Sequence, residues 1–75
     1  MEFKIDKNRV AYEAPEFYAL SMRGKHLGYT AIISKKLCTG DGKAQLRGAI
    51  TLKPFEDRTR PEIEIPVDEF IREAM

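Results

Sequence analysis

The chain has 75 residues, 43% apolar and 33% charged, with a net charge of +1, one cysteine and one histidine. A chain of this length forms one domain, residues 1–75, whose core is too small to enclose a deep substrate cavity or a large cofactor. One cysteine excludes an intramolecular disulfide, and one cysteine with one histidine excludes a zinc site built from those two residue types.

The first 24 residues carry the weakest pattern. Apolar residues at alternate positions within 3–12 predict a short hairpin that turns at residues 6–8. Residues 15–23 fit two structures. Their alternating apolar side chains favour a strand, whereas Pro15 and Gly24 also suit the two ends of a short helix. We expect the strand.

The clearest local signal is a hairpin formed by residues 29–38 and 44–53. A two-residue turn at Asp41-Gly42 would fix its register. The apolar face would then pair Leu37 with Leu46, Ile33 with Ile50, and Ala31 with Leu52. The other face would pair Cys38 with Gln45, Lys36 with Arg47, Ser34 with Ala49, Ile32 with Thr51, and Thr30 with Lys53.

The C-terminal third predicts a charged loop, a strand and a short helix. Residues 55–61 form the loop, and residues 62–65 alternate as a strand with one buried face. Four apolar residues then share one helical stripe, which packs on the sheet or forms a homodimer seam: Val67, Phe70, Ile71 and Ala74. The predicted fold is a small α+β domain, an antiparallel sheet of four to five strands with one short C-terminal helix.

Charge is distributed unevenly along the chain. Residues 23–53 hold seven lysines and arginines against one acid, whereas residues 54–75 hold seven acids against three arginines. Cations that alternate with hydroxyls on a sheet face are typical of phosphate contacts, and a tyrosine beside them can stack on an unpaired base. The residues predicted to contact single-stranded DNA or RNA are Arg23, Lys25, Lys35, Lys36, Arg47, Lys53 and Tyr29.

The sequence offers no catalytic set and no metal site. Gly40–Lys43 lacks the first glycine and the hydroxyl of a phosphate-binding loop, so it is interpreted as a turn. Glu62 and Glu64 are interpreted as an exposed acidic face, because no lysine follows at the spacing of a metal nuclease. We expect His26 to be a surface histidine in a glycine-bounded turn, and Cys38 to be an inert small side chain.

The order of elements over residues 16–75, antiparallel strands with a basic hairpin followed by a C-terminal helix, resembles the PC4-like and PurA-like single-stranded nucleic-acid-binding domains. The resemblance is one of topology and includes no shared motif, and the terminal helix is shorter here than in that family. We therefore expect a non-enzymatic, cofactor-free binding protein for single-stranded nucleic acid.

The alternative is a small interaction or inhibitor protein, such as phages and other mobile elements encode. It would dock on a host protein through the acidic residues 56–73 or the helix stripe. Because the chain has no apolar run of about 18 residues and no apolar signal-peptide core, we expect no membrane association and a cytoplasmic location.

Overall fold

The computed structural model describes residues 1–74, with side chains through residue 73. Its strands are β1 (Glu2–Lys4), β2 (Val10–Glu13), β3 (Phe17–Ser21), β4 (Tyr29–Ser34), β5 (Lys43–Gln45), β6 (Ala49–Pro54) and β7 (Ile63–Pro66). The helices are α1 (Val67–Ala74) and three short 3-10 turns, η1 (Lys7–Arg9), η2 (Gly24–His26) and η3 (Lys35–Leu37).

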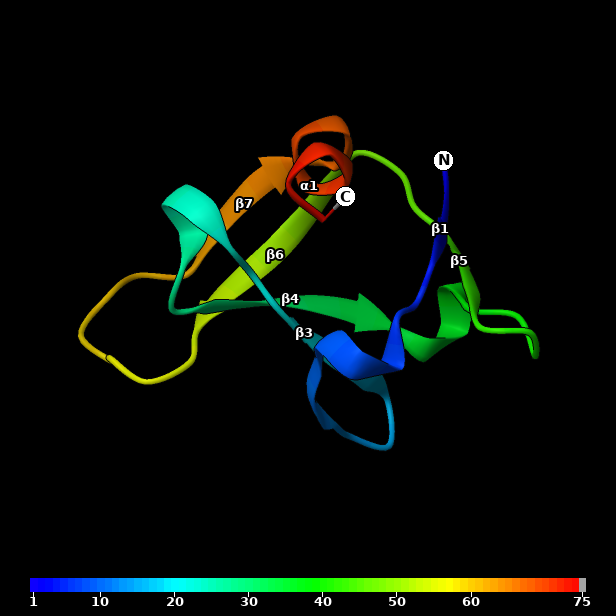
Figure 1. The fold of residues 1–75 in the computed structure, drawn as a ribbon, viewed down its shortest axis with the longest axis horizontal. Helices are drawn as coiled ribbons and strands as arrows, with labels where there is room; N and C mark the ends of the chain where they lie inside the picture. The colour runs from blue at the N-terminus through cyan, green and yellow to red at the C-terminus, as the bar shows by residue number, and fades with distance from the viewer. Residues whose placement is uncertain (75) are drawn as a thin grey trace.

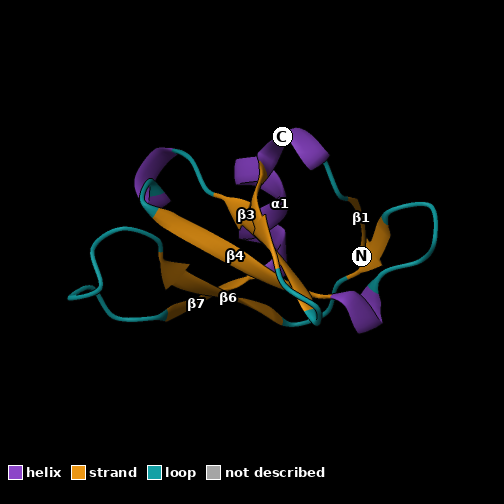
Figure 2. Cartoon of the chain, turned by 90° about the horizontal axis from the view of Figure 1, so that it is seen from below, coloured by secondary structure: helices purple, strands orange, loops and turns teal. Residues whose placement is uncertain are grey.

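The strands form two antiparallel sheets. The larger has five strands in the order β2-β3-β4-β6-β7, and β1 pairs with β5 in a second, two-stranded sheet. Figure 1 shows β1 and β5 side by side at one end of the molecule, while the long β6–β7 loop projects from the other. The view from below in Figure 2 shows the same two ends. The predicted fold class, a small α+β domain with a five-stranded sheet and one short C-terminal helix, is confirmed.

The central pairing of β4 with β6 has the predicted register. Ala31 lies opposite Leu52 in the buried core, and Ile32 lies opposite Thr51 on the other face. A one-residue slip would move every apolar side chain of the strand to the wrong face, so the alternation specified the pairing.

The turn end of the predicted hairpin is wrong. β4 ends at Ser34, whose Oγ accepts a hydrogen bond from the Lys36 backbone N–H as the chain enters η3. Leu37 is 43% exposed while Leu46 is buried, so these two side chains do not form the predicted apolar pair. Lys36 and Arg47 both lie outside the paired strands and are not opposite each other in a sheet.

The N-terminal hairpin predicted over residues 3–12 is also wrong. β1 pairs with β5, with Phe3 opposite Ala44, and β2 pairs with β3 instead. The Phe3 ring lies 5.0 Å from the Phe70 ring, so the distant pairing completes the core beneath the helix. In this pairing Gln45 lies opposite Glu2 and not opposite Cys38 as predicted. Cys38 instead forms an isolated antiparallel β-bridge with Ala44. The strand expected within residues 15–23 is confirmed as β3.

The apolar stripe of α1 packs on the sheet of its own chain. Val67 and Phe70 are buried in the core with Ile33, Leu52 and other strand residues, and Ile71 packs against its edge half-buried. Two of the residues predicted for a homodimer seam are therefore used inside the chain. The side chain of Ala74 lies outside the described residues.

Gly28 occupies a backbone conformation that other residues rarely adopt. Its φ is +92°, and an added Cβ would lie 3.0 Å from Arg60 Nη1. We expect Gly28→Ala to lower the free energy of unfolding by about 1–2 kcal/mol, because left-handed backbone is strained for any residue with a Cβ. Urea denaturation measures this loss. Gly40→Ala is the matched control, since Gly40 has no positive φ and no heavy atom within 4 Å of its built Cβ. An equal loss in both variants would contradict the strain argument.

Candidate nucleic-acid interface

The face of the five-stranded sheet opposite α1 is partly open to solvent. Residues directly opposite each other in antiparallel strands point to the same side, so the register defines which side chains share this face. One row crosses all five strands, and shorter rows lie on each side of it. We call this surface the open face; its side chains are Tyr12, Ala19, Ile32, Thr51 and Glu64 in the long row, with Phe17, Ser34, Ser21, Thr30 and Lys53 beside it.

On the open face, the ring of Tyr12 contacts two other aromatic rings. The ring of Tyr12 lies 6.0 Å from that of Phe17, edge to face, and 6.3 Å from that of Phe55 in a stacked arrangement. Tyr12 is 43% exposed and Phe55 49% exposed, although both side chains are large and aromatic. Phe17 is half-buried. The cluster presents aromatic surface to solvent on rings that hold each other in place.

Sequence reasoning missed this aromatic cluster. The apolar alternation predicts Tyr12 in an N-terminal hairpin that does not form, and the charged neighbours of Phe55 predict only a loop. The three residues come from β2, β3 and the end of β6, so only the pairing of β2 with β3 brings Tyr12 and Phe17 together. The sequence signal that remained was an aromatic residue directly after a strand, Phe55, among charged neighbours.

An open groove of about 610 Å³ lies along the same face. Its lining combines the apolar Phe17 and Ile32 with polar and charged residues, Glu16, Ser34, Lys35, Lys36 and Thr51. A groove lined by both apolar and polar groups suits a flat, partly apolar ligand such as a nucleobase.

Two of the predicted cations lie at the open face. Lys53 is exposed and lies opposite Thr30 in the register, and Lys36 lines the groove. Lys35 also lines the groove, but its ammonium is paired with Glu13 and lies 5.0 Å from the centre of the Tyr18 ring. This ion pair leaves Lys35 a weaker phosphate ligand than its neighbours.

The other predicted contact residues lie elsewhere. Lys25 Nζ is 2.6 Å from Glu69 Oε1 of α1, on the helix side of the sheet. Tyr29 is buried, its hydroxyl donates to the Pro61 carbonyl, and the Arg60 guanidinium covers its ring, so it has no free face for a base. Exposed Arg23 precedes η2 and exposed Arg47 lies in the loop before β6. The structure therefore does not gather the predicted set into one patch.

The predicted hydroxyls also differ in availability. Thr30 is 2% exposed and its Oγ1 donates to the Lys53 carbonyl, while Ser34 Oγ caps η3. Thr51 remains half-exposed on the groove. Because the hydroxyls of Thr30 and Ser34 already hydrogen-bond to the backbone, Thr51 is the hydroxyl best placed for a ligand.

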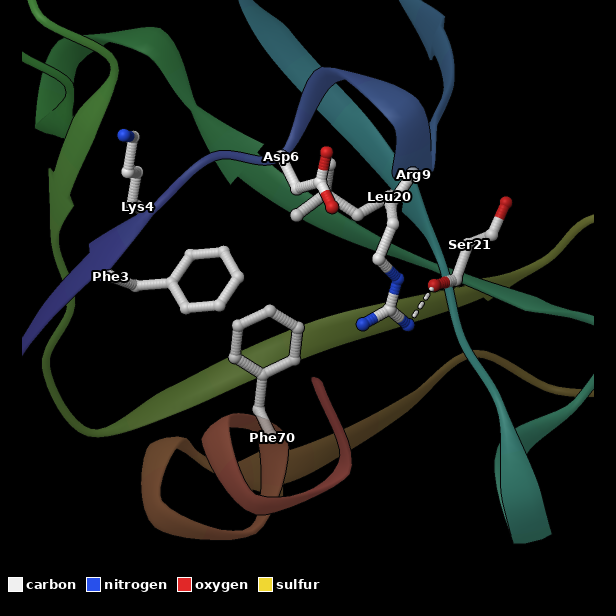
Figure 3. A pocket seen from close by; sticks show the side chains of 7 residues that line it. All are labelled: Phe3, Lys4, Asp6, Arg9, Leu20, Ser21 and Phe70. Carbon is white, nitrogen blue, oxygen red and sulfur yellow. Dashed lines mark hydrogen bonds between the residues drawn. The ribbon is translucent and has the colours of Figure 1, made fainter. Parts of the chain in front are cut away.

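A second pocket, between β1, β3 and α1, is too small for an organic ligand. It encloses about 70 Å³, and Phe3, Leu20 and Phe70 form its apolar wall. Arg9 reaches across it and donates from Nη2 to the Ser21 carbonyl at 2.9 Å (Figure 3). A space of this size admits a few water molecules, so the pocket belongs to the packing of the core rather than to ligand binding.

The single thiol has an environment that lowers its reactivity. Cys38 is half-buried and its Sγ lies 3.5 Å from the Ser34 carbonyl. Burial raises the pKa of the Cys38 thiol, with a smaller opposing effect from Lys35. Because the thiolate is the reactive form, a raised pKa disfavours nucleophilic chemistry at this position.

Within the described residues, no helix is long and apolar enough to cross a membrane. Comparison with known proteins gave no match to a family model, a curated protein or a solved structure. These comparisons give no support to the predicted resemblance to PC4-like and PurA-like domains.

Proposed function

We propose that this protein binds single-stranded nucleic acid without strong sequence preference, as a non-enzymatic module, through the open face of its sheet. The observation that carries the proposal is the exposed aromatic cluster of Tyr12, Phe17 and Phe55 beside a groove bordered by Lys36. Exposed rings on a sheet that also carries cations form a stacking platform for unpaired bases.

In the expected mechanism the nucleic acid makes two kinds of contact, one through its bases and one through its phosphates. Bases stack on the aromatic rings, and each such contact contributes about 1–3 kcal/mol. Lys36 and Lys53 lie beside the apolar surface, where they can neutralise backbone phosphates. Glu64 lies on β7 at the end of the long row and repels anions there. We therefore expect the bound nucleic acid to run across the part of the open face that is distant from β7.

Fluorescence anisotropy of labelled single-stranded DNA and RNA tests the proposal, with titrations at about 50 mM and about 200 mM salt. We expect saturable binding at the lower salt that weakens at the higher salt. Duplex DNA of the same length is the control and should bind less tightly, because its bases are not free to stack. No binding to either single strand at low salt would overturn the proposal.

Lysine substitutions should change the salt dependence of binding. Lys53→Ala and Lys36→Ala should each lower the slope of log K against log salt by about 0.7, the value for losing one phosphate contact to a single strand. Arg72→Ala removes the same charge from exposed α1, on the opposite side of the sheet, and should leave the slope unchanged. Anisotropy titrations across four salt concentrations measure all three slopes. Equal changes in the three variants would indicate a net-charge effect instead of a site.

A second proposal is docking on a host protein, favoured by exposed apolar side chains beside the charged β6–β7 loop. Leu27 is 70% exposed and Phe55 is 49% exposed, and both border one shallow pocket with Glu56. Exposed apolar side chains beside charged ones are typical of a surface that contacts a protein partner. Leu27→Gln discriminates the two proposals, since it keeps the net charge, should weaken protein docking and should leave binding of single-stranded DNA intact.

A further inference from the structure

A second cluster of chemically active side chains lies on the helix side of the sheet. It joins His26 of η2 to Glu69 and Glu73, which are one turn apart on α1. One potential metal-ligating atom from each of the three residues lies within 4.8 Å of the other two. His26 and Glu73 are 47 residues apart in the sequence, so the fold assembles the cluster.

His26 is held firmly in this cluster, contrary to the expectation of a surface histidine. It is 8% exposed, its ring lies edge-on to Tyr29, and its Nδ1 is 2.7 Å from Glu73 Oε2. Gly24, with a φ of +67°, begins the tight turn that carries the imidazole toward α1. A histidine fixed by packing loses little freedom when it binds a ligand.

The two acids differ in their present partners. Glu73 pairs with the imidazole, while Glu69 pairs with the ammonium of Lys25 at 2.6 Å. That hydrogen bond, opposed by desolvation, holds the pKa of the Glu69 carboxyl below its usual range. The Lys25 side chain is 69% exposed, so its ammonium can move into solvent without loss of core packing.

The donor set determines which cation would fit. One imidazole nitrogen with two carboxylate oxygens suits zinc and neighbouring divalent transition metals, whereas calcium and magnesium prefer oxygen ligands alone. Zinc requires ligands at about 2.0–2.2 Å and accepts water in the remaining position. Ligating atoms that already lie within 4.8 Å of one another need only side-chain rotations to reach that distance from a common centre.

We propose that His26, Glu69 and Glu73 form a binding site for one divalent transition-metal ion of the zinc class, and that the Lys25 ammonium competes with the metal for Glu69. The site is independent of nucleic-acid binding, since it lies on α1 and η2 and shares no residue with the open face. Bound metal would link η2 to the C-terminal helix, two segments that are joined here by the Lys25–Glu69 and His26–Glu73 pairs.

The test adds Zn²⁺ to tag-free protein and measures both the melting temperature and the NMR signals of the imidazole. Because the chain has one histidine, those signals need no assignment among several rings. At about tenfold excess over its Kd, Zn²⁺ should raise the melting temperature by about 5–10 °C and shift the His26 resonances. No shift of these resonances with Zn²⁺ or Co²⁺ overturns the proposal.

Lys25→Met separates a metal site from a purely structural ion cluster. This substitution removes the competing ammonium and keeps an unbranched apolar stem, so it should tighten Zn²⁺ binding about two- to fivefold. In a purely structural cluster the same variant only loses an ion pair and gains no metal response. Unchanged or weaker Zn²⁺ affinity in Lys25→Met would contradict the competition.

Ligand and control variants complete the experiment. Glu69→Gln removes one carboxylate from a partly exposed position and should weaken binding at least about tenfold without unfolding the protein. Glu62→Gln with Glu64→Gln removes two acids of the β7 region, and Cys38→Ser removes the single thiol. Both controls should bind Zn²⁺ as the unchanged chain does. A response that survives Glu69→Gln but is lost in either control would assign the metal to an adventitious surface site.

Discussion

Phe70→Ala should lower the free energy of unfolding by about 3–5 kcal/mol, the range for deleting a buried phenylalanine ring. Phe70 is 1% exposed and is among the largest fully buried side chains of the chain. Its ring contacts Phe3 of β1 while its helix rests on β6 and β7, so one side chain joins both sheets to α1. A domain of this size has only a few kcal/mol of stability, and we therefore expect the variant to be largely unfolded at 25 °C.

Circular dichroism and urea denaturation measure this effect, with Phe55→Ala as the matched control. The control deletes the same ring from a position that is 49% exposed, and we expect it to cost less than about 1 kcal/mol. A milder variant, Phe70→Leu, keeps most of the apolar volume and should remain folded with an intermediate loss. If Phe70→Ala and Phe55→Ala were equally stable, α1 would not be anchored as the structure shows.

The fold was predictable where the decisive contacts are encoded by one alternating segment. Ala31, Ile33, Ile50 and Leu52 alternate strictly, so their strands could pair in the core in one register only. The end of the chain was predictable for the same reason, since Val67 and Phe70 lie on one helical stripe. These are patterns with a period of two or of 3.6, which a single segment reveals.

The errors concern pairings between distant segments. The Leu46 N–H donates to the Met1 carbonyl at 2.7 Å, and the Ile5 N–H donates to the Gly42 carbonyl at 2.8 Å. Both bonds join the N-terminal segment to residues 42–46, for which the sequence predicts the turn end of the central hairpin. A local turn signal at Asp41-Gly42 does not show whether the residues after it pair with β1 or continue the central hairpin. Their apolar pattern fits either partner.

In the candidate site, too, the sequence predicts positions within one strand pairing but not contacts between distant segments. Lys53 was placed on the correct face because it belongs to the central register, opposite Thr30. Lys25 was assigned to a nucleic-acid surface on charge alone, yet an acid of α1 pairs with it. Charge counts along the sequence identify basic segments, but they do not identify which cations the fold neutralises. The pairing of His26 with Glu73, 47 residues apart, had no local signature.

The aromatic cluster should carry most of the binding energy for single-stranded nucleic acid. Phe55 stacks on Tyr12 with an interplanar angle of 17° and exposes nearly half its surface, so a base can continue the stack on its outer side. Losing one stacking contact costs about 1–3 kcal/mol, which corresponds to about a 5- to 150-fold weaker Kd. We expect Phe55→Ala to show a loss in this range for both single-stranded DNA and RNA.

Phe55→Trp and Phe55→Leu make the prediction specific to stacking. The tryptophan variant keeps a flat aromatic surface and should bind at least as tightly as the unchanged chain, whereas leucine keeps the apolar character without the ring face and should bind nearly as poorly as alanine. The salt slope should stay the same in all three variants, because no phosphate contact is removed. If leucine restored full affinity, the contact at Phe55 would be a general apolar one, and base stacking on its ring would be contradicted.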